Sequence, residues 1–177
     1  MKKFSTICLI ALGVLTCVLS IQCLLFIQAQ KADENQFAGT FCARFSGFSN
    51  RLRCCEDIEN ISAAEMNIRY DEIADAITYF TSSRPRSVGF LRSSTLFAPN
   101  FDASSLDALR QRIGSLALTL SKGNDLDRAD IEWLQLLSRE LERLQSAMYS
   151  NQGALHADVL KAANFSSIFE DFFSRIA

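Results

Sequence analysis

Residues 37–55 read FAGTFCARFSGFSNRLRCC, and this stretch decides the fold class. An α-helix turns once in about 3.6 residues, so side chains three or four positions apart share one face. The large apolar residues here recur at that spacing, at Phe37, Phe41, Phe45, Phe48, Leu52 and Cys55. A helix with one apolar stripe is stable when other apolar surface covers it, so we predict a core position for these rings. A lipid-binding or peptide-binding groove is the alternative interpretation.

Four further stripes follow downstream. The second begins after Ser62-Ala-Ala-Glu65, a capping-box pattern, and the third stops at Gly123-Asn124, which favours a left-handed helix end. The fourth begins near Asp125 and is broken at residues 151–153. The stripe positions are Met66, Tyr70, Ile73, Ile77 and Phe80; Leu106, Leu109, Ile113, Leu116 and Leu120; Ile131, Leu134, Leu137, Leu141, Leu144 and Met148; and Leu155, Val159, Ala162, Phe169, Phe173 and Ile176. Short links between the last three predict an all-α, up-and-down bundle of about four to five helices.

Residues 81–104 do not share this periodicity. They combine two prolines with several serines, which predicts an irregular loop between the second and third helices. Three basic residues make this loop positively charged within an acidic domain: Arg84, Arg86 and Arg92. Long loops in compact domains are often functional, so the arginines are candidates for docking an acidic partner or lipid headgroups. A solvated crossover loop is the interpretation that we favour.

Upstream, residues 4–27 contain no charge and no proline. A hydrocarbon core is crossed by roughly 20 apolar residues in a helix, whereas the apolar core of a secretory signal has about 7–15 residues. The best local cleavage site would follow Ala29, where Ile27 is a poor match to the small residue required. We therefore predict a transmembrane signal-anchor, with secretion after cleavage near Ala29 as the alternative.

The flanks of this segment predict its orientation. Lys2 and Lys3 form a short basic start, and every acidic residue lies after residue 32. By the positive-inside tendency, residues 1–3 should be cytoplasmic and the rest of the chain extracytoplasmic. We assign residues 28–35 to a juxtamembrane linker and residues 36–177 to the helical bundle.

Composition narrows the class of function. Removing two lysines from the 18 basic residues leaves 16 against 20 acidic ones, a net charge near −4 that argues against nucleic-acid binding. A catalytic or cofactor motif is not found in the sequence, and His156 is the single histidine, interpreted as a surface residue. The chain shows no Gly-rich phosphate loop and no nucleophile elbow, and its carboxylate pairs fall on polar helix faces. We predict no enzyme activity, no cofactor and no metal site.

The six cysteines do not indicate a disulfide scaffold. Three of them lie in the apolar segment and behave as small hydrophobic residues: Cys8, Cys17 and Cys23. Of the other three, Cys42 and Cys54 would lie about 18 Å apart along one helix, beyond disulfide reach. The adjacent pair Cys54-Cys55 could serve a metal or redox role, but we favour packing because Cys55 continues the apolar stripe.

The last stripe is the widest. Phe165, Ile168 and Phe172 extend it beyond its regular positions, toward Ile176. We predict that part of this surface, with Phe165, Phe172 and Ile176, contacts a second copy of the chain or another protein.

Residues 105–148 resemble the N-terminal helical region of the spore germination protein YpeB family. The residues that carry the resemblance are Leu106-Asp-Ala-Leu109, Arg112-Ile113-Gly114, Leu120, Gly123, Leu126, Asp130, Trp133-Leu134 and Leu137. The family shares a basic start, one N-terminal membrane segment and outward-facing helices, and its larger members continue into further C-terminal domains. The resemblance implies a non-catalytic partner protein linked to sporulation or germination, with no catalytic residues to transfer.

The residues and the resemblance lead to one functional hypothesis and two alternatives. We predict a membrane-anchored, non-enzymatic interaction module with a protein partner in or near the same membrane. The first alternative is an extracytoplasmic sensory or ligand-binding bundle that acts through a membrane partner. The second is a secreted effector, which requires cleavage near Ala29.

Overall fold

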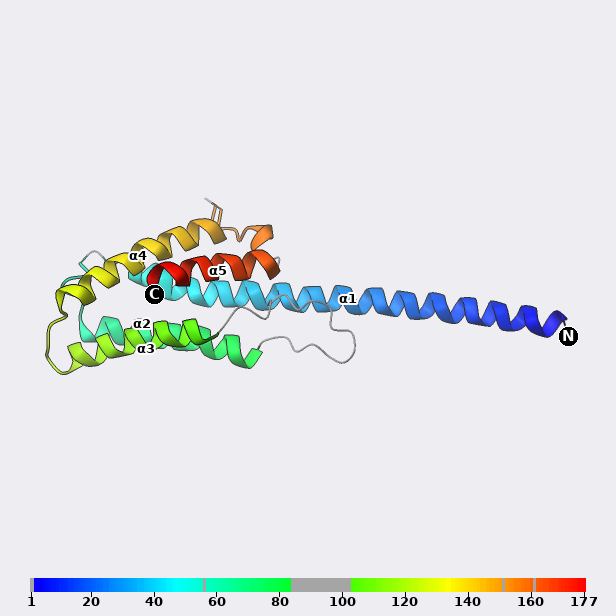
Figure 1. The fold of residues 1–177 in the computed structure, drawn as a ribbon, viewed down its shortest axis with the longest axis horizontal. Helices are drawn as coiled ribbons and strands as arrows, with labels where there is room; N and C mark the ends of the chain where they lie inside the picture. Colours follow the sequence, from blue (N-terminus) through cyan, green and yellow to red (C-terminus); the bar gives the residue numbers. More distant parts are fainter. Residues whose placement is uncertain (1, 56, 84–102, 151, 161) are drawn as a thin grey trace. The chain divides into compact units, whose positions relative to one another are not determined.

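The computed structural model describes residues 2–55, 57–83, 103–150, 152–160 and 162–177 (Figure 1). Within these ranges the elements are helical: α1 (Lys2–Arg53), α2 (Ala63–Ser83), α3 (Ala103–Ser121), α4 (Arg128–Met148), the 3-10 helix η1 (Ala157–Leu160) and α5 (Ala162–Ile176). The described residues contain no strand, and one isolated antiparallel bridge joins Tyr149 to Leu155. The predicted all-α class is confirmed.

The chain divides into two compact units, residues 1–36 and 37–177, and we describe each by itself. α1 contributes to both, and residues 28–35, which we assigned to a linker, are helical within it. Among the described residues, one helix is long and apolar enough to cross a membrane, and it is the N-terminal one.

Two helix ends in the second unit follow the sequence signals. The Ser62 hydroxyl accepts from the Glu65 amide at 3.2 Å, and a Glu65 carboxylate oxygen accepts from the Ser62 amide at 3.0 Å. This is the reciprocal capping box predicted before α2. Gly123 has a φ of +77° after α3, and its amide donates to the Leu120 carbonyl at 2.9 Å. The Asn124 amide donates to the Thr119 carbonyl at 3.3 Å, which completes a Schellman end.

The core is built around phenylalanine rings from three helices. The ring of Phe41 in α1 lies 5.2 Å from that of Phe80 in α2, and 5.8 and 5.5 Å from those of Phe165 and Phe169 in α5. Ring pairs at such distances add favourable edge-to-face contacts to the burial of apolar area. The stripe in residues 37–52 is buried as predicted, at Phe37, Phe41, Phe45, Phe48 and Leu52.

A buried arginine joins α2 to α1, and a glycine lets α3 approach α2 closely. The buried Arg69 of α2 donates to the carbonyl oxygen of Arg51 at 3.0 Å, which satisfies an orphan carbonyl at the end of α1. α2 and α3 contact each other, and a Cβ at Gly114 would lie 2.9 Å from the Tyr70 ring. Glycine therefore permits this approach of α3 to α2.

Two predicted boundaries are wrong. Residues 81–83 belong to α2 and residues 103–104 to α3, so helix covers both ends of the loop predicted at 81–104. The last helix begins at Ala162 instead of Leu155, because the chain first turns back after α4. In this turn Gly153 has a φ of +77°, and the Ser150 amide donates to the Ala154 carbonyl at 2.8 Å. Leu155 thus pairs with Tyr149 before η1 begins.

Candidate functional site

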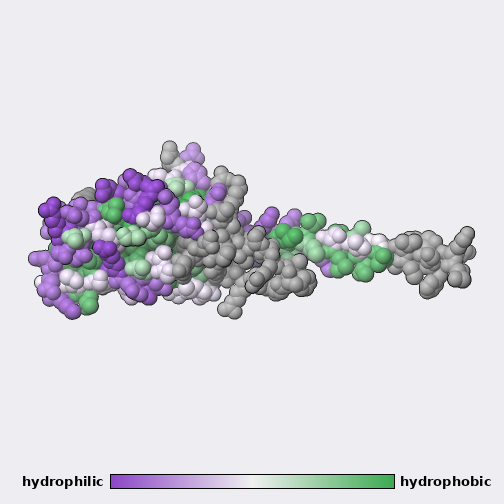
Figure 2. Space-filling model, viewed as in Figure 1, coloured by the Kyte–Doolittle hydropathy of each residue, from purple (hydrophilic) through white to green (hydrophobic). Residues whose placement is uncertain are grey.

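The apolar side chains of α1 between residues 12 and 27 are exposed on all sides of the helix. The large ones are between 42% and 62% exposed: Leu12, Val14, Leu15, Val18, Leu19, Ile21, Leu24, Leu25, Phe26 and Ile27. In Figure 2 they appear as apolar surface, whereas polar residues cover much of the visible face of residues 37–177. A helix that is apolar all round requires an apolar solvent or a buried environment.

The hydroxyl groups in this segment are satisfied within the helix. Thr16 donates to the Leu12 carbonyl at 2.7 Å, and Ser20 donates to the Thr16 carbonyl at 2.8 Å. In hydrocarbon, an unpaired polar group costs several kcal/mol, so these bonds remove a barrier to insertion. The segment is therefore chemically suited to a membrane interior.

The six residues predicted to bind a partner fall into two groups. Arg84, Arg86 and Arg92 lie outside the described residues. Phe165, Phe172 and Ile176 are buried in the core of residues 37–177, at 0%, 3% and 7% exposure. The helices of this unit cover the stripe on α5, and Ile168 is half-buried beside it. These three side chains are therefore not available for a partner in this structure.

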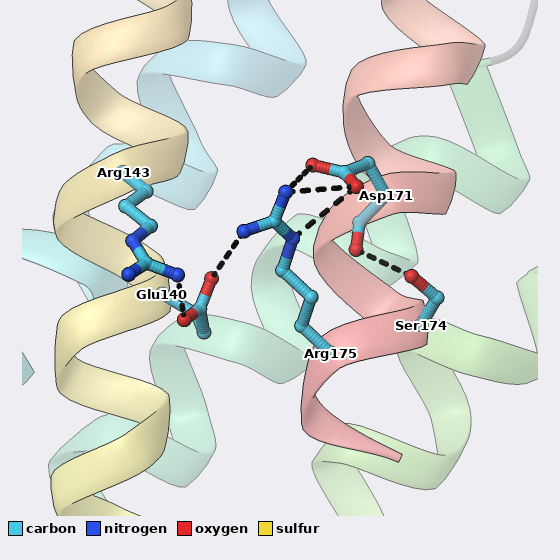
Figure 3. A network of polar contacts seen from close by, with 5 residues as sticks. All are labelled: Glu140, Arg143, Asp171, Ser174 and Arg175. Atoms are coloured by element: carbon cyan, nitrogen blue, oxygen red, sulfur yellow. Dashed lines mark hydrogen bonds and ion pairs between the residues drawn. The ribbon is translucent and has the colours of Figure 1, made fainter.

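A polar network instead joins α4 to α5 at the surface (Figure 3). The Glu140 carboxylate, which is 5% exposed, accepts from Arg143 Nη1 at 2.6 Å, and its second oxygen lies 3.7 Å from Arg175 Nη1. Arg175 also pairs with Asp171 at 2.9 Å, one turn earlier on α5. Each of the two carboxylates in the network is paired with a guanidinium group. The network therefore links the two helices through balanced charges.

A polar cleft of about 450 Å³ lies between the end of α1 and the end of α4. The Asn50 side-chain oxygen accepts from Gln145 Nε2 at 2.8 Å and from Arg53 Nη2 at 3.3 Å. The lining residues are Asn50, Arg53, Gln145, Ser146, Tyr149, Ser150 and Gly153. The cleft offers amide, hydroxyl and guanidinium groups, which are suited to hydrogen bonding with a polar surface.

Tyr149 is one of the residues that line this cleft. Ser46 donates to the Tyr149 hydroxyl oxygen at 3.0 Å, which connects α1 to the end of α4. Partial burial raises the pKa of the Tyr149 phenol, and the hydrogen bond to Ser46 opposes that shift. The phenol therefore stays neutral at physiological pH and can both donate and accept. The sequence does not predict this cleft, because residues 151–153 indicate only the end of a helix.

The three cysteines downstream of the apolar segment and the one histidine differ in their exposure to solvent. Cys42 is fully buried, and burial raises the pKa of its thiol to about 12. Cys54 is exposed, and the half-buried Cys55 donates to the Asp57 carbonyl at 3.6 Å. His156 is exposed, as predicted. Within the described part of the chain, no group of three or more His, Cys, Asp or Glu side chains could hold a metal ion.

Comparison with known proteins found no matching family model, no matching curated protein and no matching solved structure. The resemblance to the YpeB family therefore stays a prediction.

Proposed function

We propose that this chain is a membrane-anchored, non-enzymatic interaction module whose residues 36–177 lie on the outer side of a bacterial membrane. The observation that carries the proposal is the segment of α1 at residues 12–27. Its apolar side chains are exposed on all sides, and its described hydroxyls bond to its own backbone. Lys2 and Lys3 at the start of the chain support a cytoplasmic N-terminus.

The second part of the proposal concerns architecture. We infer that residues 37–177 form an up-and-down bundle. In support, α2 contacts α3, α4 contacts α5, and rings of α1 meet rings of both α2 and α5. The turn between α3 and α4 is short, which favours antiparallel neighbours.

The partner-binding surface in this proposal is the polar cleft between α1 and α4. A partner is a protein in or near the same membrane, since the anchor confines the chain to that surface. The side chains of Gln145, Ser146 and Arg53 each donate one hydrogen bond within the chain and have further capacity: Gln145 and Ser146 can accept through their oxygens, and Arg53 has other N–H donors. A polar surface of this kind is typical of transient protein contacts rather than permanent ones.

Insertion and orientation are tested together. The full chain is expressed in a bacterial host, membranes are washed with alkaline carbonate, and the intact mass is measured. We expect the uncleaved chain in the membrane pellet, with residues 37–177 digested when protease is added to spheroplasts. A soluble chain that begins after Ala29 would support the secreted alternative. Protection from external protease would contradict the orientation.

The cleft is tested by photo-crosslinking from two positions on α4. A photoreactive amino acid replaces Ser146 at the cleft, and in a matched variant it replaces the exposed Gln135 on the same helix. We expect a discrete crosslinked membrane protein from position 146 alone. Equal products from both positions, or none from position 146, would remove the cleft from the proposal.

The link to sporulation is a further part of the proposal, and the resemblance of residues 105–148 supports it. The test is deletion of the coding gene in a spore-forming host that carries it. We expect spores that germinate more slowly, with rescue by the full chain and not by a chain lacking residues 4–27. Normal germination of the deletion strain would contradict the link.

A further inference from the structure

A second cavity, of about 260 Å³, lies where α3, α4 and α5 meet. Leu109 and Arg112 of α3, Trp133 of α4, and Phe173 and Ile176 of α5 form most of its wall. It is separate from the polar cleft, and nothing in the proposed function uses it. Small-molecule sites in proteins are concave and mostly apolar, with a few polar groups that fix orientation. This cavity has that composition.

The apolar wall is held in place by the fold. The indole Nε1 of Trp133 donates to the Ile176 carbonyl at 3.1 Å, in a buried hydrogen bond between α4 and the last turn of α5. The Phe173 ring lies 5.1 Å from the ring of Phe172 and 6.4 Å from that of Phe169. A wall fixed in this way needs little ordering when a ligand enters, which favours affinity.

One cation stands at the edge of the cavity. The guanidinium carbon of Arg112 lies 4.1 Å from the centre of the Trp133 ring, in a cation–π contact. Within the described part of the chain Arg112 has no ion pair, whereas its neighbour Arg110 pairs with Asp107 at 3.1 Å. A guanidinium over an aromatic ring retains N–H donors in a planar fork, and such a fork can bind a carboxylate through two hydrogen bonds.

We propose that this cavity binds a small hydrophobic carboxylic acid. The carboxylate pairs with Arg112, and the apolar part lies between Leu109, Trp133 and Phe173. If each non-hydrogen atom takes the roughly 30 Å³ of a liquid water, the cavity holds about nine such atoms. That size fits a short aliphatic chain or a single aromatic ring with its carboxylate at the rim. The site does not depend on membrane insertion.

The experiment uses Trp133, the one tryptophan of the chain, as the reporter. The full chain in lipid nanodiscs is titrated with 3-phenylpropanoate while tryptophan fluorescence is recorded, and 3-phenylpropanamide is the matched neutral probe. We expect a saturable change with a Kd of about 1 mM or tighter for the acid, and binding at least about tenfold weaker for the amide.

Two variants locate the binding site. Arg112→Gln removes the charge and should weaken the acid at least about tenfold while leaving the amide unchanged. Ala108→Phe, at an exposed position on the cavity wall, should block both probes. Arg128→Gln removes an equal charge at a residue outside the cavity wall and should bind the acid like the natural chain. Thermal unfolding curves confirm that each variant is folded.

Three outcomes would overturn the proposal. The first is no saturable change for the acid, and the second is equal binding of acid and amide. The third is an unaltered Kd in folded Arg112→Gln, which would place any binding in the lipid or at another surface.

Discussion

The two parts of α1 differ in apolar content and in surroundings: 12 of the 16 residues at 12–27 are apolar, against 8 of the 16 at 37–52. Between residues 12 and 27, apolar side chains point to every side of the helix, and the large ones are at least 42% exposed. Between residues 37 and 52, they form one stripe, and its phenylalanines are at most 2% exposed. The difference teaches that a helix with apolar residues on every side requires apolar surroundings all round, whereas a helix with one apolar stripe requires a protein core on that side alone.

The polar residues of the two parts differ in the same way. In the first part, Thr16 and Ser20 bond to carbonyls of their own helix, so they make no demand on the surroundings. In the second part, Arg44 and Arg51 lie away from the stripe and pair with Asp75 and Glu72 of α2. Arg44, Asp75 and Arg51 are exposed and Glu72 is half-buried, so these pairs contribute little stability and the rings carry the packing.

The largest expected effect separates the two parts by removing one ring from each. Phe41→Ala empties the centre of the ring cluster and should destabilise residues 37–177 by about 3–5 kcal/mol. Phe26→Ala, in the exposed segment, should leave that stability unchanged. The measurement is urea unfolding of the full chain in detergent micelles, followed by Trp133 fluorescence. Equal unfolding curves for the two variants would contradict the assignment of the core.

The sequence alone predicts this comparison well. A helix with a phenylalanine at every turn of one face is stable when other apolar surface covers that face. The core position of residues 37–52 therefore follows from the local pattern. The uncharged apolar run at residues 4–27 likewise predicts, from local sequence alone, a helix long enough to cross a membrane. The helix ends at Ser62 and Gly123 are local as well, because each is fixed by residues within one turn.

The second expected effect comes from placing a charge in the first part of α1, with a charge on the surface of α2 as the control. Leu15→Arg introduces a cation near the centre of the segment at residues 4–27 and should weaken membrane insertion by about 3 kcal/mol. Ile68→Arg, at an exposed apolar position of α2, should not change insertion. The measurement is the ratio of inserted to non-inserted chain in microsomes, with a glycosylation site as reporter. If Leu15→Arg inserts like the natural chain, residues 4–27 are not the anchor.

The candidate sites could be predicted far less well than the fold. The polar cleft joins Asn50 to Gln145, which are 95 positions apart, and no local pattern brings them together. The width of the stripe on α5 suggested an external partner, yet whether Phe172 is covered depends on rings supplied by α1. The stacking of Arg112 on Trp133 likewise depends on how α3 packs against α4.

The third expected effect is a pH dependence that Cys42, in the second part of α1, contributes to stability. Burial raises the pKa of Cys42 from 9.0 to about 12, so the unfolded chain loses this proton first as pH rises. Stability is therefore fully present below pH 9 and declines between pH 9 and 12. From pH 8 to pH 10, the natural chain should lose about 1.4 kcal/mol more than Cys42→Ala. Cys54→Ala, at an exposed thiol, should keep the natural pH dependence, and a flat difference for Cys42→Ala would contradict the burial.

The smallest expected effect tests whether the second part of α1 depends on the helix that covers it. Ser62→Ala removes the hydroxyl that accepts from the Glu65 amide, and loss of such a cap costs about 1 kcal/mol. Because α2 supplies Phe80 to the ring cluster, this loss should appear in the Trp133 unfolding transition, although Trp133 lies on α4. Ser62→Asn retains a capping oxygen and should recover most of the stability. Membrane insertion should be the same for both variants, since residues 4–27 require no covering helix. A fall in α2 helicity without a shift in the Trp133 transition would show that the ring cluster does not couple the helices.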